Sequence, residues 1–490
     1  LIEGALLVIA VLFALLGTGR ARVARQVGLT YAFNTAGSIV GALAVGFVLM
    51  PRFGAVGVWK FVGGVLVVLA LLLVILEVLR ARREGLRRVS WALATGALAV
   101  WLLGSEGPTA ITRHTPIGAG RVNLAGLDKN EVRDWSHRTR LRLLWERDGV
   151  ESSLGVAHGN GLTFLVSGKA DGAVYGDRGT QALSGVIPAL LHDGVKNAFV
   201  LGLGTGMTAG WLSSVPGVEH VDVAELEPAI IEVARGAAAA NQNVLERPNV
   251  HLFVGDGREC LLTGERKYDL LVSEPSNPYR AGVASLFTRE FYTAAAARLS
   301  PNGVFAQWVQ GYEIDVQTLR IVLVTLRSVF HFVEAWQTQG GDMLMLASRE
   351  PRVVGVERVR ARALTEPFRS VLPRAGLVGD AEGVLSRFLA TDAVIGGIAT
   401  AVPAPINTDD ENALEYAFAR QVGSGGGSIP VQLAELTQSR GIARPEVRGA
   451  VDWRRVDELR RRAWLVMGTG NAPDLPLPDA GTRARARAFV

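Results

Sequence analysis

The sequence contains few of the residues that build metal centres and disulfide bonds. Among its 490 residues there is one cysteine, Cys260, and seven histidines, no two of which are spaced as a pair of metal ligands. A single cysteine excludes an intrachain disulfide and a zinc site built from cysteines. We therefore predict that the protein carries no metal.

Charged residues are scarce in the first hundred residues, and the chain does not begin with methionine. This start predicts a sequence that begins inside a longer protein or is processed, and the first apolar run lacks the basic residues that open a signal peptide. Residues 30–50 and 56–76 are apolar stretches long enough to cross a bilayer, whereas 89–103 is short for a full crossing. Buried helices of a soluble domain rarely run this long without a polar face. We predict a transmembrane helical region over residues 1–105.

From residue 118 to 195 the apolar runs become short and alternate with glycine turns. The runs at 141–146, 155–157 and 162–166 are typical of antiparallel strands, and residues 181–192 are typical of a helix. We predict a small β-rich domain here, ahead of a larger fold.

Four apolar strands follow between residues 198 and 273, and each ends in glycine or polar residues. These are Gly202, Gly204, Thr205 and Gly206 after the first strand, Glu225 after the second, Asp256 and Gly257 after the third, and Glu274 and Asn277 after the fourth. Glycines let the backbone turn sharply beside a ligand, and an acid about twenty residues later can hold both hydroxyls of a ribose. Each motif alone has an ordinary explanation as a turn or a surface acid. Their order and spacing predict a nucleotide-type site on one edge of a parallel sheet.

With these motifs the chain resembles the spermidine synthases (polyamine aminopropyltransferases), in particular the bacterial branch in which this domain follows membrane helices. The resemblance extends from about residue 118 to 420 and includes 224–228, 287–292 and 307–308. It implies an α/β, Rossmann-like fold of the S-adenosylmethionine-dependent transferase kind, with the catalytic domain over residues 196–420. It also implies decarboxylated S-adenosylmethionine as cosubstrate. The glycine loop would contact this molecule through its backbone, and the acids matching Glu225 and Asp256 would bind its ribose and adenine.

The resemblance also implies which residues handle the amine. Glu274 stands at the position of the family's general base, one methylene longer than the usual aspartate. Tyr175 and Gln181 fall where the family has residues facing the substrate cleft. Thr205 and Asn277 replace two aspartates, so the pocket presents less negative charge to a diamine. We therefore predict Glu274 as the base, Tyr175, Gln181 and Asn277 as substrate-binding residues, and an amine other than putrescine as substrate.

Three functions stay open. Aminopropyl transfer to a small-molecule amine agrees with the resemblance. Methyl transfer from ordinary S-adenosylmethionine uses the same fold, although the acid usual in such methyltransferases is missing at Val200. A membrane-bound sensor of a nucleoside or polyamine would keep binding without turnover. A homodimer is left open as well.

The charge pattern bears on location. The formal net charge is +5, and arginines gather at 20–25 and 80–88, beside the apolar stretches, so a lipid bilayer is a simpler partner than nucleic acid. Both basic loops are expected in the cytoplasm, which would place the large domain outside if residues 89–103 crossed fully. A nucleotide cosubstrate favours the cytoplasm. We predict a multi-pass protein of the cell inner membrane with a cytoplasmic catalytic domain and a third segment that does not fully cross.

Three later segments carry weaker predictions. Residues 278–285, with Gly282, are expected to lie over the site as a gate. Residues 407–410 are expected to form a turn or helix-capping cluster rather than to take part in chemistry. Residues 421–490 are expected to form a linker, glycine-rich at 424–428, and an arginine-rich helical tail.

Overall fold

The computed structural model divides the chain into two compact units. One comprises Leu1–Thr109 and Asp148–Val150, and the other Ala110–Arg147 and Glu151–Val490. The residues that the structure describes are 23–80, 96–97, 100–101, 103–104, 124, 126–159, 161–280, 282–376, 379–421, 429–439 and 444–466. The predicted linker at 424–428 and most of the third apolar segment lie outside the described residues.

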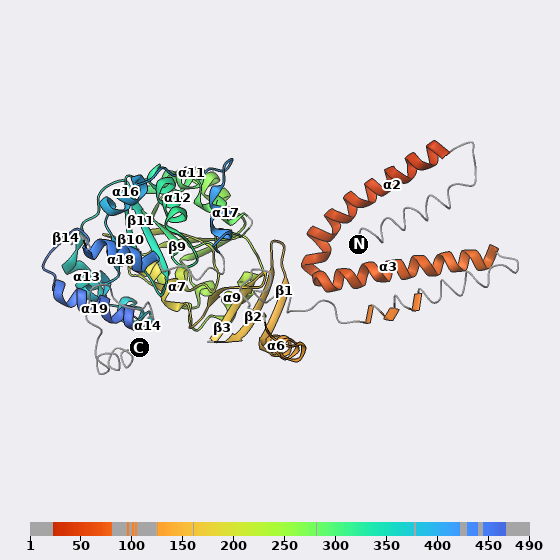
Figure 1. Cartoon of the computed structure of the whole chain (residues 1–490), viewed down its shortest axis with the longest axis horizontal. Coiled ribbons are helices and arrows are strands. Elements are labelled where there is room, and N and C mark those ends of the chain that lie inside the picture. Colours follow the sequence, from red (N-terminus) through yellow and green to blue (C-terminus); the bar gives the residue numbers. More distant parts are fainter. Residues whose placement is uncertain are drawn as a thin grey trace. The chain divides into compact units, whose positions relative to one another are not determined.

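The first unit is helical. Helix α2 (Val23–Ala44) continues through a π-helical turn, η1 (Val45–Leu49), into α3 (Met50–Arg80). Gly54, with φ 67° and ψ 172°, interrupts the helical backbone, and Figure 1 shows the chain turning back in this region. One stretch, Tyr31–Val68, is long and apolar enough to cross a membrane, and none of its most apolar part is buried. This stretch covers most of the first predicted crossing and part of the second; the described helices do not give two separate spans.

Helix α6 (Lys129–Arg142) opens the described part of the second unit. Its start is a capping box, in which the Glu131 amide donates to the Asp128 carboxylate at 2.9 Å and the Asp128 amide donates to the Glu131 carboxylate at 2.8 Å. Because this helix extends to Arg142, the strand predicted over 141–146 begins only at Leu143. The helix itself was not predicted, although Asp128 and Glu131 carry its signal.

A small sheet follows, as predicted, and it has four strands. Its strands are β1 (Leu143–Asp148), β2 (Ser153–Gly159), β3 (Gly161–Val166) and β4 (Lys169–Ala173). They lie in the order β1-β2-β3-β4, and β3 is antiparallel to both β2 and β4. Helix α7 (Arg178–Leu191) then leads to the main sheet.

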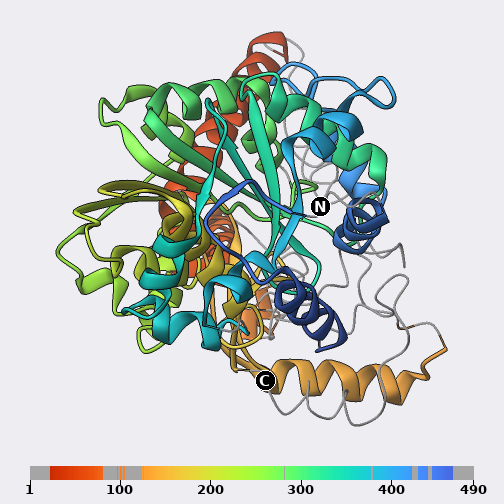
Figure 2. The same cartoon turned by 90° about the vertical axis from the view of Figure 1, so that its left-hand side faces the viewer.

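The main sheet has eight strands in the order β13-β10-β11-β9-β8-β5-β6-β7. Their bounds are β5 Asn197–Leu201, β6 His220–Glu225, β7 Val250–Val254, β8 Tyr268–Ser273, β9 Leu299–Gln310, β10 Phe332–Gln337, β11 Asp342–Ser348 and β13 Phe388–Ala390. Strands β5 to β9 are parallel, whereas β11 pairs antiparallel with β9 and β10. The chain proceeds from β5 to β7 on one side and returns to β8 on the other, so the strand order reverses between β5 and β8. Figure 2 shows the twist of this sheet.

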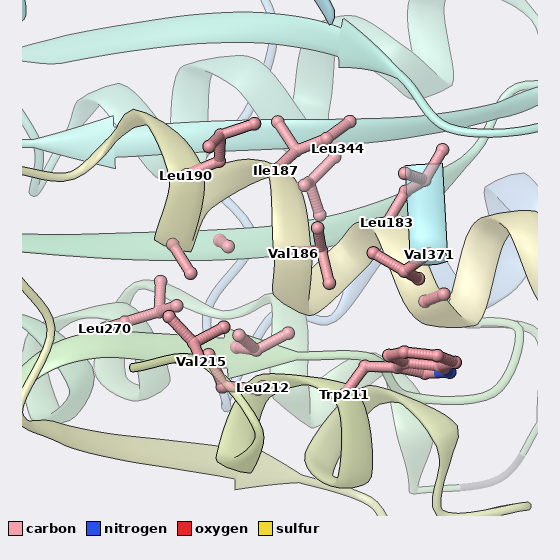
Figure 3. Close-up of a cluster of buried hydrophobic side chains, with 14 of the residues drawn as sticks. Leu183, Val186, Ile187, Leu190, Trp211, Leu212, Val215, Leu270, Leu344 and Val371 are labelled. Carbon is pink, nitrogen blue, oxygen red and sulfur yellow. The ribbon is translucent and has the colours of Figure 1, made fainter. Parts of the chain in front are cut away.

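Both faces of the sheet are covered, because successive strand residues point to opposite sides. Val200 packs in the same cluster as Leu183 and Leu212, whereas Phe199 packs with Phe305 on the other face. In Figure 1, α7, α13 and α14 lie on one side of the strands and α11, α12 and α16 on the other. Figure 3 shows α7 and α8 contributing Leu183, Val186, Ile187, Trp211 and Leu212 to one cluster. This doubly wound arrangement confirms the predicted α/β fold.

The remaining helices cover these faces and the carboxyl-terminal part. They are α8 Met207–Ser213, α9 Ile230–Gly236, α10 Gly257–Thr263, α11 Arg289–Arg298, α12 Val316–Arg327, α13 Val356–Ala363, α14 Phe368–Arg374, α15 Ala381–Leu385, α16 Asp392–Thr400, α17 Ala413–Ala419, α18 Ile429–Ser439 and α19 Trp453–Val466, with the short 3-10 turns η2 Val244–Glu246 and η3 Val283–Phe287. Two short strands, β12 (Val354–Gly355) and β14 (Val447–Arg448), pair in parallel.

Residues 407–410 connect several segments through hydrogen bonds and an ion pair, in agreement with the predicted turn or helix-capping cluster. The buried Asn407 side chain donates to the carbonyl of Phe287 at 3.2 Å and accepts from the amide of Leu414 at 3.2 Å. Asp409 pairs with Arg258 and accepts a hydrogen bond from Thr288 at 2.8 Å. These contacts tie together segments that are distant in sequence.

Close packing of α8 gives a first test of this fold. A Cβ on Gly210 would lie 1.8 Å from the backbone oxygen of Asn241, so we expect Gly210→Ala to lower the free energy of unfolding by about 1–3 kcal/mol or more. Gly236→Ala is the matched control, because its Cβ would meet no atom within 4 Å. Thermal unfolding of both variants measures the effect, and equal midpoints would contradict the packing of α8 against residue 241.

Candidate functional site

The candidate site lies where the carboxyl ends of β5 and β8 meet. Strand order reverses between these two strands, and open parallel sheets bind ligands at such a point. Gly202 follows β5 and Glu274 follows β8, and a Cβ on Gly202 would lie 3.3 Å from the Glu274 carbonyl oxygen. The structure therefore brings the predicted glycine loop next to the predicted base.

The glycine loop depends on left-handed backbone. Gly202, Gly204 and Gly206 have φ angles of 93°, 51° and 80°, which favour glycine. The side-chain amide of Asn241 donates to the carbonyl of Thr205 at 2.7 Å and so stabilises the loop. The Thr205 hydroxyl, which is buried, donates to the Gln181 side chain. The side chain that replaces an acid in the resembling family is thus turned into the protein.

Glu225 fixes the same loop from the end of β6. One carboxylate oxygen accepts the amide hydrogen of Leu203 at 2.9 Å, and the other accepts that of Glu227 at 2.9 Å. Burial raises the pKa of Glu225, and these amide hydrogen bonds oppose the rise. Each carboxylate oxygen has a second lone pair, so the geometry fits a group that also accepts hydroxyl hydrogens.

Asp256 and Gly257 lie at the end of β7. The Asp256 carboxylate caps α10 by accepting the amide hydrogen of Arg258 at 2.8 Å, and the residue is exposed. A Cβ on Gly257 would lie 2.9 Å from Leu201 Cγ, which explains the glycine by close approach of α10 to β5. The contact of Asp256 with an adenine stays a prediction.

Glu274 has a strongly perturbed carboxylate. Its side chain lies 2.5 Å from the Thr208 hydroxyl, which is also 2.8 Å from the carbonyl of Gln181. Burial is the main cause that raises the pKa of Glu274 to about 8; the hydrogen bond from Thr208 opposes the rise, and the charges of Asp342 and Asp177 contribute to it. One hydroxyl hydrogen serves two acceptors here. Thr208 can donate to Glu274 when the acid is ionised, and to Gln181 when Glu274 is protonated and donates in turn.

Two further acids, absent from the sequence-based prediction, belong to this group. Asp342 begins β11 and accepts the Thr180 hydroxyl hydrogen at 2.6 Å through one carboxylate oxygen, and its other oxygen is buried. Burial raises the pKa of Asp342 to about 6, and burial also raises the pKa of Asp177. The three acids are far apart in sequence, which is why no local motif revealed them.

Asn277 has a partner that the sequence did not suggest. Its side-chain oxygen accepts from the ammonium of Lys169, and its amide donates to Gln310. Lys169 begins β4 and is only 8% exposed. Buried lysines are rare unless paired, and here the pairing includes Asp171 at 3.3 Å. Through Lys169, Asn277 therefore connects the end of β8 to the small sheet.

The other two predicted substrate-binding residues differ in placement. Gln181, on α7, bonds to Thr205 and donates to the carbonyl of Ala173 at 3.2 Å, so its amide faces the protein. Tyr175, in the turn after β4, is 60% exposed. No hydrogen bond within the described residues joins Tyr175 to the other candidates. Their roles stay predictions.

The segment predicted as a gate follows Asn277. Arg280 pairs with Asp171 and donates to the carbonyl of Val166, so the described part of this segment is tied to the small sheet. No group of three or more histidine, cysteine, aspartate or glutamate residues within the described part of the chain could hold a metal ion.

Comparison with known proteins bears on this geometry. A family model of the spermine/spermidine synthase domain matches residues 180–339, which include most of α7, the glycine loop, Glu225 and Glu274. Residues 180–339 belong to the spermidine synthase family. The matched residues begin within α7 and end between β10 and β11.

Individual proteins that match this chain are polyamine aminopropyltransferases and spermidine synthases. The polyamine aminopropyltransferase of Alkaliphilus metalliredigens is 30% identical over 155 residues, which are 31% of this chain and 54% of that protein. That of Mycobacterium tuberculosis is 29% identical over 331 residues, 66% of this chain and 59% of that protein. The chain spans about half the length of the curated relatives that it matches. The solved spermidine synthase of Thermotoga maritima aligns with a TM-score of 0.39 and 19% identity over 43% of this chain and 73% of that one.

Proposed function

We propose that the protein is an aminopropyltransferase that transfers the aminopropyl group of decarboxylated S-adenosylmethionine to an amine. The observation that carries the proposal is Glu274, an acid with a pKa raised to about 8 that lies beside the glycine loop where β5 and β8 meet. Membership of residues 180–339 in the spermidine synthase family supports the reaction class.

The reaction makes simple demands on the protein. The amine nitrogen attacks the carbon next to the sulfonium, a C–N bond forms, and the C–S bond breaks with its electron pair passing to sulfur. Methylthioadenosine leaves as a neutral thioether. The sulfonium already activates the carbon, so the site must align the partners and accept one proton from the amine.

Glu274 suits this proton transfer. A base works best when its pKa is near the working pH, and the raised pKa of Glu274 places it there. We infer that Thr208 follows the change, donating to the ionised carboxylate and turning its hydrogen to the Gln181 carbonyl once Glu274 is protonated. Gly202, Gly204, Thr205, Gly206, Glu225, Asp256 and Gly257 would hold the nucleoside part.

The direct experiment separates the three functions left open. The purified full chain is incubated with decarboxylated or ordinary S-adenosylmethionine and a panel of amines, and products are identified by mass. We expect methylthioadenosine together with an aminopropylated amine. A methylated product would replace the proposal by methyl transfer, and nucleoside binding without product would replace it by a sensor.

We also propose that the first unit anchors the protein in the inner membrane through two crossings, at residues 30–50 and 56–76. The large exposed side chains of Phe33 and Trp59, 75% and 60% exposed, support a lipid environment. The non-helical backbone at Gly54 supports a turn between two crossings. Carbonate extraction should leave the full chain in the membrane pellet; recovery in the supernatant would contradict the anchor.

The proposed orientation has its own test. With Cys260, the sole cysteine, replaced by serine, cysteine is introduced by Phe53→Cys at the turn or by Glu265→Cys on the exposed surface of the large domain. An impermeant maleimide should label the first variant in intact cells and the second only after lysis. Labelling of the second variant in intact cells would place the catalytic domain outside.

A further inference from the structure

A cavity of about 150 Å³ lies at the end of the main sheet that is opposite the candidate site. It is lined by the end of α7, the start of β9 and the chain from β11 into β12: residues 191–193, 301–304 and 348–354. Strand β11 is antiparallel to β9, with Ala347 opposite Phe305, so the end of β11 meets the start of β9. Thr180 and Asp342, which belong to the surroundings of Glu274, stand at the other ends of α7 and β11. The cavity is therefore separate from the candidate site.

One guanidinium in the wall of this cavity has no bonding partner. Arg352 Nη1 is buried, and Arg352 makes no hydrogen bond or ion pair within the described part of the chain. Burial lowers the pKa of Arg352; the charges of Glu334 and Asp193 oppose this change, and that of Arg358 adds to it. A buried donor without an acceptor is costly and rarely left so in folded proteins. This donor therefore points to an acceptor from outside the described chain.

Two neighbouring side chains are held by the protein itself. His192 accepts the amide hydrogen of Gly194 through Nδ1 at 3.1 Å, so its Nε2 carries the hydrogen that points to the Asn302 carbonyl, 3.0 Å away. Arg358 pairs with Asp193, while its Nε is buried without a partner among the described residues. Arg352 is thus the cavity-lining cation whose planar fork is open to a ligand.

The formal charges around the cavity cancel. As many acids as arginines line it or act on its lining residues: Arg349, Arg352, Arg358 and Arg362, and Asp193, Asp269, Glu334 and Glu350. An anion is therefore held here by directed hydrogen bonds from a desolvated guanidinium and not by an excess of positive charge. Because the exposed acids Asp193 and Glu350 line the cavity, they repel a dianion more strongly than a monoanion.

We propose that this cavity is a binding site for a small carboxylate monoanion, which Arg352 holds through two parallel hydrogen bonds. A guanidinium presents its donors in a plane that matches the two oxygens of a carboxylate. The bound carboxylate supplies the acceptor that Arg352 Nη1 lacks among the described residues. The inference does not depend on the proposed aminopropyl transfer, because the cavity shares no residue with the site around Glu274.

The test compares propionate with propionamide, a neutral molecule of the same shape, and with inorganic phosphate, which is mainly a dianion at pH 8. Binding to the full chain is measured by calorimetry at pH 8. We expect propionate to bind at least about tenfold more tightly than either of the others. Arg352→Met should weaken propionate binding at least about tenfold. Arg352→Lys keeps the positive charge but loses the planar fork, so it should also weaken propionate binding, and it decides the matter if Arg352→Met fails to fold.

Two further variants make the outcome decisive. Arg369→Met removes an exposed arginine of α14 that pairs with Glu366, and it should leave all affinities unchanged. Glu334→Gln removes an acid that acts on Arg352, and it should retain propionate binding. If propionate binds only after Glu334→Gln, Arg352 is paired with Glu334 in the unaltered protein and the inference is overturned. Equal binding of propionate and propionamide, tighter binding of phosphate, or an unchanged affinity for propionate in the Arg352 variants would overturn it as well.

Discussion

Glu274→Gln is expected to lower the turnover rate about a hundredfold or more while leaving the affinity for methylthioadenosine unchanged. Glutamine keeps the size of the side chain and its contact with the Thr208 hydroxyl at the end of β8, but it cannot accept the proton of the attacking amine. Single-turnover kinetics measure the chemical step, and calorimetry measures nucleoside binding. A structural acid that only shapes the loop would show the opposite pattern, with little change in rate.

The pH profile gives a second reading of the same residue. Only ionised Glu274 accepts a proton, so kcat/KM should rise with pH through a limb near pH 8, the pKa to which burial raises this acid. The amine substrate titrates separately, near pH 10, as a lysine does. The limb near pH 8 should disappear in Glu274→Gln. Glu265→Gln, at an exposed acid, is the control that should retain it.

Stability should depend on the same ionisation. Because the pKa of Glu274 in the folded protein lies above its ordinary value, folding is favoured most below about pH 4.5, and this contribution is lost as pH rises towards 8. Glu274→Gln carries no such charge, so its free energy of unfolding relative to the unaltered protein should rise by roughly a few kcal/mol between pH 5 and 9. Parallel stability curves would mean that Glu274 is not strongly perturbed.

Much of this edge could be predicted because its signals are local. Each strand from β5 to β8 is a short apolar run ending in residues of special backbone or charge, and parallel strands bring their ends to one edge. Gly202 and Glu274 were therefore expected together before the sheet order was known. The capping box of Asp128 and Glu131, which marks the start of α6, is an equally local signal.

The amine half could not be predicted in the same way. Lys169 lies in a segment whose glycines predict a hairpin, and nothing in that segment shows that its ammonium is buried against Asn277, more than a hundred residues later. Asp342 becomes part of the site only because β11 inserts next to β9 in the main sheet. The pKa of a buried acid is changed by such neighbours, which are close in space but distant in sequence. The sequence therefore revealed the missing aspartates but not the cation that accompanies them.

Glu225→Ala is expected to weaken methylthioadenosine binding by about a hundredfold or more. A buried carboxylate that accepts two ribose hydroxyl hydrogens contributes a few kcal/mol. In the structure the carboxylate also accepts the amide hydrogens of Leu203 and Glu227, so its loss would leave two buried donors without an acceptor and loosen the glycine loop. Glu225→Gln should also weaken binding, because one of its two terminal groups is a donor and cannot accept an amide hydrogen.

A comparison of ligands separates the ribose contact from the loop. Calorimetry is performed with methylthioadenosine and with adenine, which lacks the ribose, and thermal unfolding is recorded in parallel for Glu225→Ala and for Glu219→Ala, a control at an exposed acid. If Glu225 holds the ribose, its variant should lose far more affinity for the nucleoside than for adenine. Equal losses for both ligands would assign Glu225 to the loop alone. Unchanged affinity for methylthioadenosine would remove Glu225 from the site, and with it the main reason to place a ribose at the end of β6.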